Sequence, residues 1–175
     1  GTEAGCDVII GAGGGTAIDT AKAVATLMGG IPCVILPTIA SNDAPCAGLS
    51  VVYNEEGVVV KVINMLRNPD VVLVDTGIIA QAPKSYLVSG IGDALATYLE
   101  ARACWRTGFR TMARGNCSHT SLTMAKLCYD LLLGHSVKAL AAVENKEVNE
   151  DLENVVEASI FLSGFGAICG GLAAA

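Results

Sequence analysis

The feature that most constrains the fold is an alternation of short apolar runs and glycines near the start of the chain. Residues 7–11 form a short apolar run that ends in glycine, as buried strands of parallel sheets do. Three glycines at positions 13–15 follow, and residues 16–28 then place apolar side chains on one helix face. A pair of glycines ends this helix, and residues 32–36 form the next apolar strand. The pattern predicts a βαβ unit with a right-handed crossover.

The rest of the chain adds three short strands and then becomes helical. The strands are expected at residues 49–53, 58–64 and 71–75, the first two of them flanking an Asn-Glu-Glu-Gly turn. Beyond Pro83 the spacing of apolar side chains is helical throughout. The expected helices cover residues 84–107, 119–135 and 150–175.

These elements predict an α/β part followed by an all-α helical part. We place the first part in residues 1–80 and the second in residues 81–175. A chain of 175 residues is long enough to bury a sizeable core without disulfides or metals.

Composition and charge exclude several classes of protein. Apolar residues make up 52% of the chain and charged residues 16%, which excludes intrinsic disorder. The net charge of -6 has the wrong sign for tracking phosphates, so no nucleic-acid partner is expected. The seven cysteines lie in apolar runs, and none has the Cys-x-x-Cys spacing of a zinc or redox motif. This pattern favours a reducing compartment, and we predict a cytoplasmic protein.

Residues 158–175 contain no charged side chain, and this length approaches that of a membrane span. Four of these residues are glycine, however, and serine and alanine dilute the apolar character further. We therefore predict a close-packed helix of a soluble bundle and no membrane partner. An apolar end of this kind is unfavourable in water, which suggests that the chain is incomplete.

The three glycines at positions 13–15 form the first candidate binding site. A glycine-rich turn between strand and helix lets backbone amides approach a phosphate, and the helix N-terminus adds a positive dipole end. The turn lacks the last glycine of the usual dinucleotide fingerprint, because Thr16 stands there, and it lacks the Gly-Lys-Ser/Thr ending of a P-loop. The residues alone predict an anion site, and a tight turn without a ligand is the alternative.

The polar loop of residues 37–45 forms the second candidate site. It follows a buried strand, at the edge where open α/β sheets bind ligands. Thr38 and Ser41 could bond to a cofactor, and Asp43 could accept hydrogen bonds from substrate hydroxyls. A turn stabilised only by its own Asn, Asp and Ser side chains is the alternative.

Asp93 forms the third candidate site, because a carboxylate among small apolar helical residues is costly to bury without a partner. Glu100 lies seven residues on, on the same helix face, so the two could bind a hard cation. Pairing with Lys or Arg is the alternative. His119 and His135 have no metal-ligand spacing and are predicted to lie on the surface.

Taken together, three segments resemble the NAD-dependent glycerol dehydrogenases, which belong to the iron-containing (group III) alcohol dehydrogenases. The segments are Gly13–Lys22, Pro37–Pro45 and Gly90–Ala103, and the end of the chain resembles the same proteins. The resemblance covers nearly the whole chain and implies a dehydroquinate synthase-like architecture. In this architecture residues 1–80 would be a partial NAD-binding α/β domain with an incomplete parallel sheet, and residues 81–175 a partial α-helical metal and substrate domain. It also implies NAD-linked oxidation of glycerol, or of a related polyol, to products such as dihydroxyacetone.

The resemblance assigns roles to particular residues. Asp43 matches the residue that contacts glycerol, and Asp93 matches the first of three ligands to a zinc ion that polarises the substrate hydroxyl. The residues that inherit NAD contacts are Gly14, Gly15, Thr16, Asp19, Thr38, Ile39, Ala40, Ser41, Leu49 and Tyr53.

The chain also departs from the family pattern. The family's other two zinc ligands are histidines, and neither His119 nor His135 stands at a matching position. The chain therefore resembles a central fragment that lacks both ends, for which we expect little turnover alone. The alternative is an inactive remnant that binds a nucleotide or a partner. In either case we expect a homo-oligomer or a partner subunit to cover the open edges.

Overall fold

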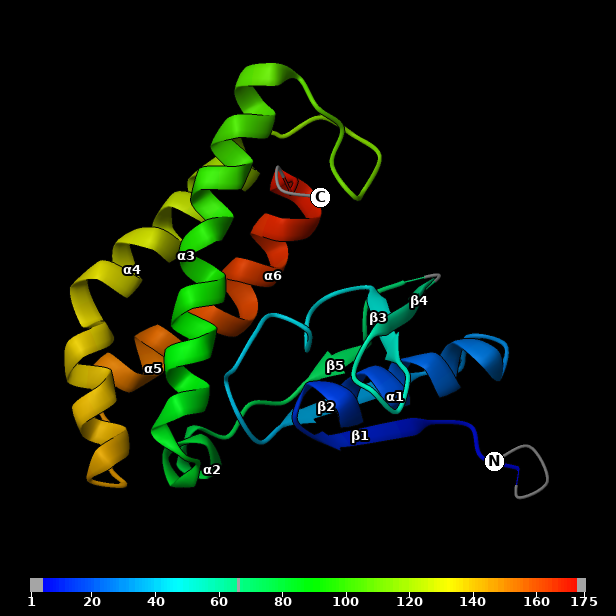
Figure 1. The fold of residues 1–175 in the computed structure, drawn as a ribbon, viewed down its shortest axis with the longest axis horizontal. Coiled ribbons are helices and arrows are strands. Elements are labelled where there is room, and N and C mark those ends of the chain that lie inside the picture. The colour runs from blue at the N-terminus through cyan, green and yellow to red at the C-terminus, as the bar shows by residue number, and fades with distance from the viewer. Residues whose placement is uncertain (1–4, 66, 173–175) are drawn as a thin grey trace. The chain divides into compact units, whose positions relative to one another are not determined.

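The computed structural model describes residues 5–65 and 67–172 (Figure 1). The chain divides into two compact units. The α/β unit comprises the described residues up to Thr38 together with Ala44–Asp75. The helical unit comprises Ile39–Asp43 and the described residues from Thr76 onward. The segment Ile39–Asp43 thus groups with helices that come much later in the sequence.

The α/β unit contains the expected βαβ motif. It consists of strand β1 (Ile9–Gly13), helix α1 (Gly15–Leu27) and strand β2 (Cys33–Pro37). The strands pair in parallel, with Gly13 opposite Pro37, and β5 (Val71–Val72) adds to β2 to give the order β1-β2-β5. The prediction of a parallel sheet is confirmed, although the strand at residues 71–75 is shorter than expected.

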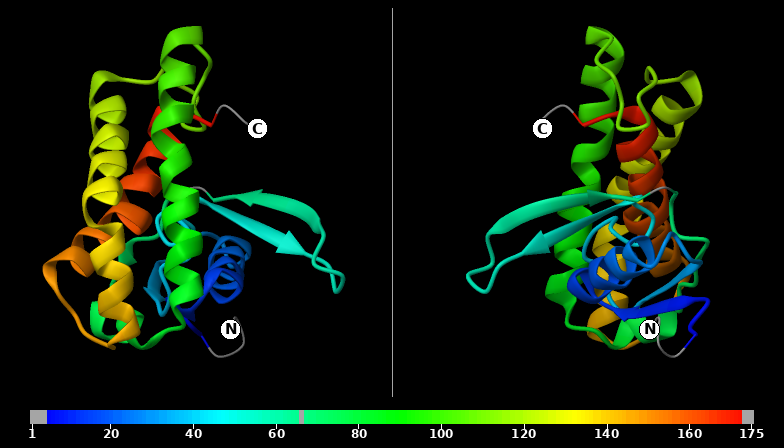
Figure 2. Two further views of the ribbon diagram at one scale, coloured as in Figure 1. Left: turned by 60° about the vertical axis from the view of Figure 1, so that its left-hand side comes forward. Right: turned by 90° about the vertical axis from the view of Figure 1, so that its right-hand side faces the viewer.

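The strands β3 (Leu49–Tyr53) and β4 (Val59–Asn64) form a separate antiparallel ribbon, which Figure 2 shows from two sides. The side chain of Asn54 shapes the connecting turn by accepting hydrogen bonds from the backbone amides of Glu56 and Val58, at 3.1 and 2.8 Å. Gly57 supplies the positive φ that the turn requires. The predicted hairpin is confirmed.

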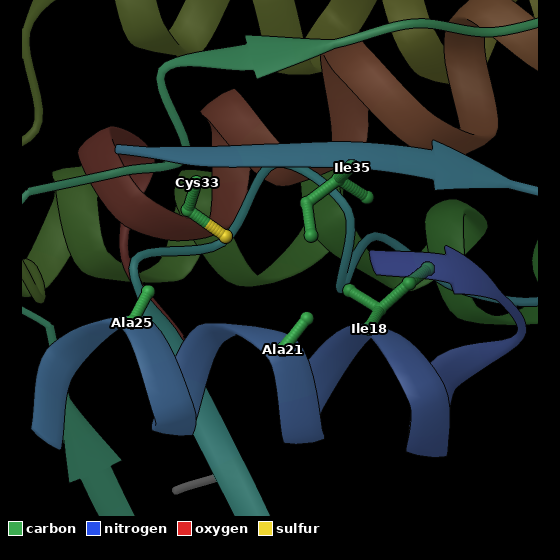
Figure 3. Close-up of a cluster of buried hydrophobic side chains, with 5 residues drawn as sticks. All are labelled: Ile18, Ala21, Ala25, Cys33 and Ile35. Carbon is green, nitrogen blue, oxygen red and sulfur yellow. The ribbon is translucent and has the colours of Figure 1, made fainter. Parts of the chain in front are cut away.

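The core of the α/β unit lies between α1 and β2 (Figure 3). Ile18, Ala21 and Ala25 come from one face of α1 and pack against Cys33 and Ile35. The helix also lies against β1 at Gly11, where a Cβ atom would be only 2.5 Å from the Cβ of Ala21. A larger residue at either position would therefore push the helix off the sheet.

The helical unit is built from two long helices and a third that contains π-helical turns. Helix α3 (Lys84–Thr107) has the predicted bounds and ends at Gly108, which has φ +68. Ser118 and Ser121 form a capping box at the start of α4 (His119–Glu144). The remaining elements are α2 (Thr76–Gln81), α5 (Glu150–Glu157), the π-helical turns η2 (Ala158–Leu162) and η3 (Gly166–Gly170), and α6 (Ser163–Phe165).

In this unit one sequence expectation was wrong and one helix was missed. Helix α4 does not end near His135 but continues to Glu144, because Gly134 and His135 are accommodated within the helix. His135 is half-buried and its Nδ1 lies 2.7 Å from a carboxylate oxygen of Asp151 on α5. Helix α2 was not expected, since six residues carry too little periodicity to reveal a helix.

The segment Glu150–Gly170 is long and apolar enough to cross a membrane, yet 61% of its most apolar stretch is buried inside the fold. It packs on α3 through small residues. Ser163 and Thr97 are hydrogen-bonded at 2.9 Å between their hydroxyl oxygens. A Cβ atom at Gly166 would lie 2.4 Å from a methyl group of Thr97, and one at Gly170 would lie 2.8 Å from the Cβ of Ala101. The apolar stretch therefore has the packing of a core helix.

The glycines of the helical unit differ in the space around them, so substitutions at Gly166 and Gly134 should have opposite effects on stability. Gly166→Ala should destabilise the helical unit by about 1–3 kcal/mol, because the added methyl group overpacks the contact with Thr97. Gly134→Ala meets nothing within 4 Å and should stabilise α4 by up to about 1 kcal/mol. Urea unfolding followed by circular dichroism measures both, and equal effects of the two substitutions would contradict the packing described.

Candidate functional site

The glycine turn leaves the start of α1 without a side-chain cap. Gly13 has φ +146, a conformation that side chains disfavour, and its Cβ would lie 2.8 Å from the Cβ of Ala17. Gly14 is the N-cap residue of α1 and no side chain caps the first turn. The next residues, Gly15 and Thr16, begin the helix, and Thr16 is exposed. Backbone amides and the dipole of α1 can therefore serve an anion at this turn.

The two predicted cofactor segments of the α/β unit meet at the carboxyl ends of its strands. The backbone amide of Thr38, directly after β2, donates a 3.0 Å hydrogen bond to the carbonyl oxygen of Gly13, at the end of β1. This hydrogen bond continues the parallel ladder of the two strands. Thr38 therefore lies beside the glycine turn, at the edge where open α/β sheets bind ligands.

Asp19, a predicted cofactor contact, has its carboxylate turned into the protein. The residue is 7% exposed, and its carboxylate lies 2.8 Å from the Nζ of Lys22. Its carbonyl oxygen accepts a 2.7 Å hydrogen bond from Ser50, next to Leu49 on β3. Leu49 is half-buried and Tyr53 is 49% exposed. A direct NAD contact from Asp19 stays a prediction, whereas its bonds to Lys22 and Ser50 are structural.

In the helical unit, the segment Ile39–Asp43 lies directly on α3. Ala40 is 1% exposed, and its carbonyl oxygen would be 2.1 Å from a Cβ atom at Gly90. Asp93 lies one turn after Gly90 on α3, and its carboxylate accepts a hydrogen bond from the backbone amide of Asp43. The structure thus brings together Asp43 and Asp93, the predicted substrate contact and the predicted metal ligand. The glycine at position 90 permits this approach.

The two carboxylates give this place a negative potential. Partial burial raises the pKa of Asp93, although the residue keeps solvent exposure, and the hydrogen bond from the Asp43 amide opposes the rise. Burial raises the pKa of the Cys128 thiol to about 12, and the charges of Asp43 and Asp93 add to this rise. Cys128 on α4 is therefore a neutral thiol, and it donates to the carbonyl oxygen of Ala158 at 3.3 Å.

Cys128 is a residue that sequence reasoning did not place at this site. Its only signal in the sequence is a small apolar position inside a helix, which any buried cysteine shares. The contact between Ala40 and Gly90 was also missed. The Gly-x-Gly-Asp sequence that ends at Asp93 could have indicated a close backbone approach, because glycine inside a helix otherwise costs stability.

The described residues do not make a zinc site by themselves. Within residues 5–65 and 67–172, no group of three or more His, Cys, Asp and Glu side chains could hold a metal. The ring of His119 lies against that of Trp105 at a tilt of 54°, with centroids 4.6 Å apart, and His135 bonds to Asp151. Asp93 supplies one carboxylate, where a catalytic zinc takes about three protein ligands. Among the ion pairs of the described residues, none joins Asp93 to a Lys or Arg side chain.

Comparison with known proteins shows which proteins the chain is similar to. The iron-containing alcohol dehydrogenase family matches residues 2–76. The glycerol dehydrogenase of Escherichia coli O6:H1 is 52% identical over 170 residues, which cover 97% of this chain and 46% of that protein. The chain is a relative of the iron-containing alcohol dehydrogenases. The resemblance to glycerol dehydrogenases expected from the three motifs is confirmed.

Solved structures agree with this kinship. The crystal structure of a probable glycerol dehydrogenase from Sinorhizobium meliloti 1021 superposes with a TM-score of 0.92 at 41% identity, covering 98% of this chain and 48% of that one. The sulfoacetaldehyde reductase of Bifidobacterium kashiwanohense, solved in complex with NAD+, shares the fold with a TM-score of 0.76 at 21% identity, covering 98% of this chain and 47% of that one. The chain spans about half the length of the relatives it matches.

The raised pKa of Asp93 predicts that Asp93→Asn stabilises the chain at neutral pH. The folded chain binds this proton more tightly than the unfolded chain, so the ionised carboxylate costs folding free energy above the ordinary value of 3.8. Asparagine keeps an oxygen for the Asp43 amide and carries no charge. We expect a higher Tm for Asp93→Asn at pH 7, in the presence of a chelator, and a difference that shrinks as the pH falls toward about 4.

The matched control is Asp130→Asn, which removes an exposed carboxylate that forms an ion pair with Lys126 on α4. It should leave the Tm at pH 7 unchanged or slightly lower. A lower Tm for Asp93→Asn at pH 7 would show that the carboxylate is stabilising and would overturn the prediction.

The contact between Ala40 and Gly90 predicts a local effect of Gly90→Ala. The added Cβ cannot lie 2.1 Å from the Ala40 carbonyl oxygen, so the segment Ile39–Asp43 must move away from α3. Loss of the bond from Asp43 to Asp93 should speed hydrogen exchange of the Asp43 amide by about tenfold or more. Gly92→Ala is the control, because nothing lies within 4 Å of its Cβ. Equal exchange rates of the Asp43 amide in the two variants would contradict the predicted effect of Gly90→Ala.

Proposed function

We propose that the chain carries the NAD-binding and substrate-binding residues of a glycerol dehydrogenase-type oxidoreductase. The observation that carries this proposal is the 52% identity to a glycerol dehydrogenase over 97% of the chain. The reaction is the oxidation of glycerol to dihydroxyacetone, or of a related polyol to its ketone. A hydride passes from the carbon to NAD+, and the hydroxyl proton is released.

The geometry supports a place for the cofactor. In the α/β unit, Gly14, Gly15 and Thr16 present the start of α1 to the pyrophosphate, and Thr38 lies beside that turn. The other residues proposed to contact NAD are Asp19, Ile39, Ala40, Ser41, Leu49 and Tyr53. The proteins of this fold include one solved with NAD+, which supports the choice of cofactor.

Asp43 is proposed to accept hydrogen bonds from the polyol, and Asp93 to provide one zinc ligand. The hydrogen bond from the Asp43 amide to the Asp93 carboxylate supports this assignment, because it brings the two acidic residues together and a site that takes up a cation gains from negative charge. The zinc would need further ligands from outside the described residues, since these supply only Asp93. We further propose a cytoplasmic protein that assembles with itself or with a partner subunit.

A chimera tests the proposal. The chain replaces the aligned stretch of the Escherichia coli glycerol dehydrogenase, and NADH formation from NAD+ and glycerol is followed by absorbance in the presence of zinc. The expected result is glycerol-dependent NADH formation. A folded chimera that binds NAD+ but oxidises neither glycerol nor other polyols would overturn the proposal and favour the alternative, an inactive nucleotide-binding remnant.

The position of the pyrophosphate predicts the effect of charge at Thr16. Thr16→Asp places a negative charge on the first turn of α1. This charge interacts favourably with the helix dipole but repels a phosphate. We expect the Kd for NAD+ to rise about tenfold or more, which corresponds to about 1.4 kcal/mol or more. Thr16→Asn is the neutral control and should stay close to the parent protein. Isothermal titration measures both, and equal affinities would place the pyrophosphate elsewhere.

A further inference from the structure

Lys22 is a fully buried cation in the α/β unit. It lies in the second turn of α1, three residues after Asp19, and none of its surface is exposed. Lysine is almost never buried to this extent unless its charge is paired, because removing an ammonium group from water is costly. The contacts of its amino group therefore indicate what the residue does.

The ammonium group of Lys22 has three donors and faces three acceptors. Its Nζ lies 2.8 Å from a carboxylate oxygen of Asp19 and donates to the carbonyl oxygens of Ala44, at 2.8 Å, and Ala47, at 3.3 Å. The hydrogen-bonding capacity of the group is thus used completely. Two of the three acceptors are backbone carbonyls of a loop that is distant in sequence.

That loop carries residues of the proposed site on both sides of the two carbonyls. Ala44 directly follows Asp43, and Leu49 lies two residues after Ala47. The buried Ser50 hydroxyl adds a third bond between this stretch and α1, because it donates to the carbonyl oxygen of Asp19. The same helix begins at the glycine turn. Helix α1 therefore links the proposed phosphate site to the loop that follows Asp43.

Stability alone is a poor reason for this arrangement. An apolar side chain of similar volume often replaces a buried ion pair without loss of stability, or even with a gain. Such a replacement would not orient two carbonyl oxygens, however, whereas an ammonium group binds both at fixed distances. What the charge adds beyond packing is the placement of the loop.

We propose that Lys22 is a positioning residue that fixes the loop Ala44–Leu49 on α1 and thereby sets the geometry of the neighbouring cofactor and substrate contacts. The fixing of the loop follows from contacts within the α/β unit. The effect on catalysis rests on the proposed function. Lys22 itself is not expected to touch NAD or the polyol, since it is enclosed on all sides.

The first test measures the loop without reference to activity. Lys22→Met keeps the length of the side chain and removes the charge, and hydrogen exchange of the amides in residues 44–50 is followed by mass spectrometry. We expect this exchange to accelerate by about tenfold or more, because the two carbonyls lose their donor. Lys61→Met is the matched control, since Lys61 is an exposed lysine on β4. Unchanged exchange in Lys22→Met would overturn the proposal.

A second variant covers the case in which Lys22→Met does not fold. The single substitution leaves the Asp19 carboxylate buried without a cation, which is destabilising in its own right. The double variant Asp19→Asn/Lys22→Met removes both charges and should fold. Faster exchange in residues 44–50 is expected there as well, and native exchange rates would overturn the proposal.

The third test uses the chimera and separates positioning from stability. For the folded Lys22→Met chimera we expect kcat/KM for glycerol to fall about ten- to a hundredfold. The Kd for ADP, which lacks the nicotinamide and its ribose, should change less than about twofold. Kinetic constants equal to those of the parent chimera would reduce Lys22 to a structural residue. A parent chimera without activity would instead overturn the proposed function and leave the exchange experiments as the test of Lys22.

Discussion

The close packing of α1 on the parallel sheet is the contact on which the rest of the α/β unit depends. At Gly11 the backbone of β1 lies so near to Ala21 that no residue larger than glycine fits at position 11. Ile18 and Ala25 complete the contact of α1 with β2. This packing holds the helix start at the ends of β1 and β2 and places Lys22 against the loop after Asp43. One helix thus provides the N-terminus for the proposed anion site and a buried charge for the loop.

The helical unit brings two acidic residues, Asp43 and Asp93, together through a backbone hydrogen bond. The segment Ile39–Asp43 approaches α3 over Gly90, and the Asp43 amide bonds to Asp93. An ionised carboxylate in a partly desolvated place is unfavourable, and the raised pKa of Asp93 reflects that cost. Arrangements of this kind trade stability for function, because a bound cation can compensate the charge.

Much of the architecture could be predicted from local patterns. The βαβ unit, the hairpin around Asn54 and the bounds of α3 follow from apolar periodicity and turn residues, which act over a few positions. Helix α4 was predicted too short, because Gly134 and His135 resemble an ending when viewed locally. The bond from His135 to Asp151 and the packing of α4 on α5 compensate the weak helix propensity there. Tertiary contacts of this type leave no periodic signal.

For the candidate site, the sequence by itself determined which residue types were available. It placed the glycines before a helix, Thr38 after a strand and Asp93 among small helical residues, because these features depend on neighbours in the chain. Only the tertiary structure decided that Asp43 meets Asp93 and that Lys22 binds the carbonyls of Ala44 and Ala47. Each of these contacts joins residues at least twenty positions apart. Their approach depends on how helices and loops pack, which no local pattern of residues encodes.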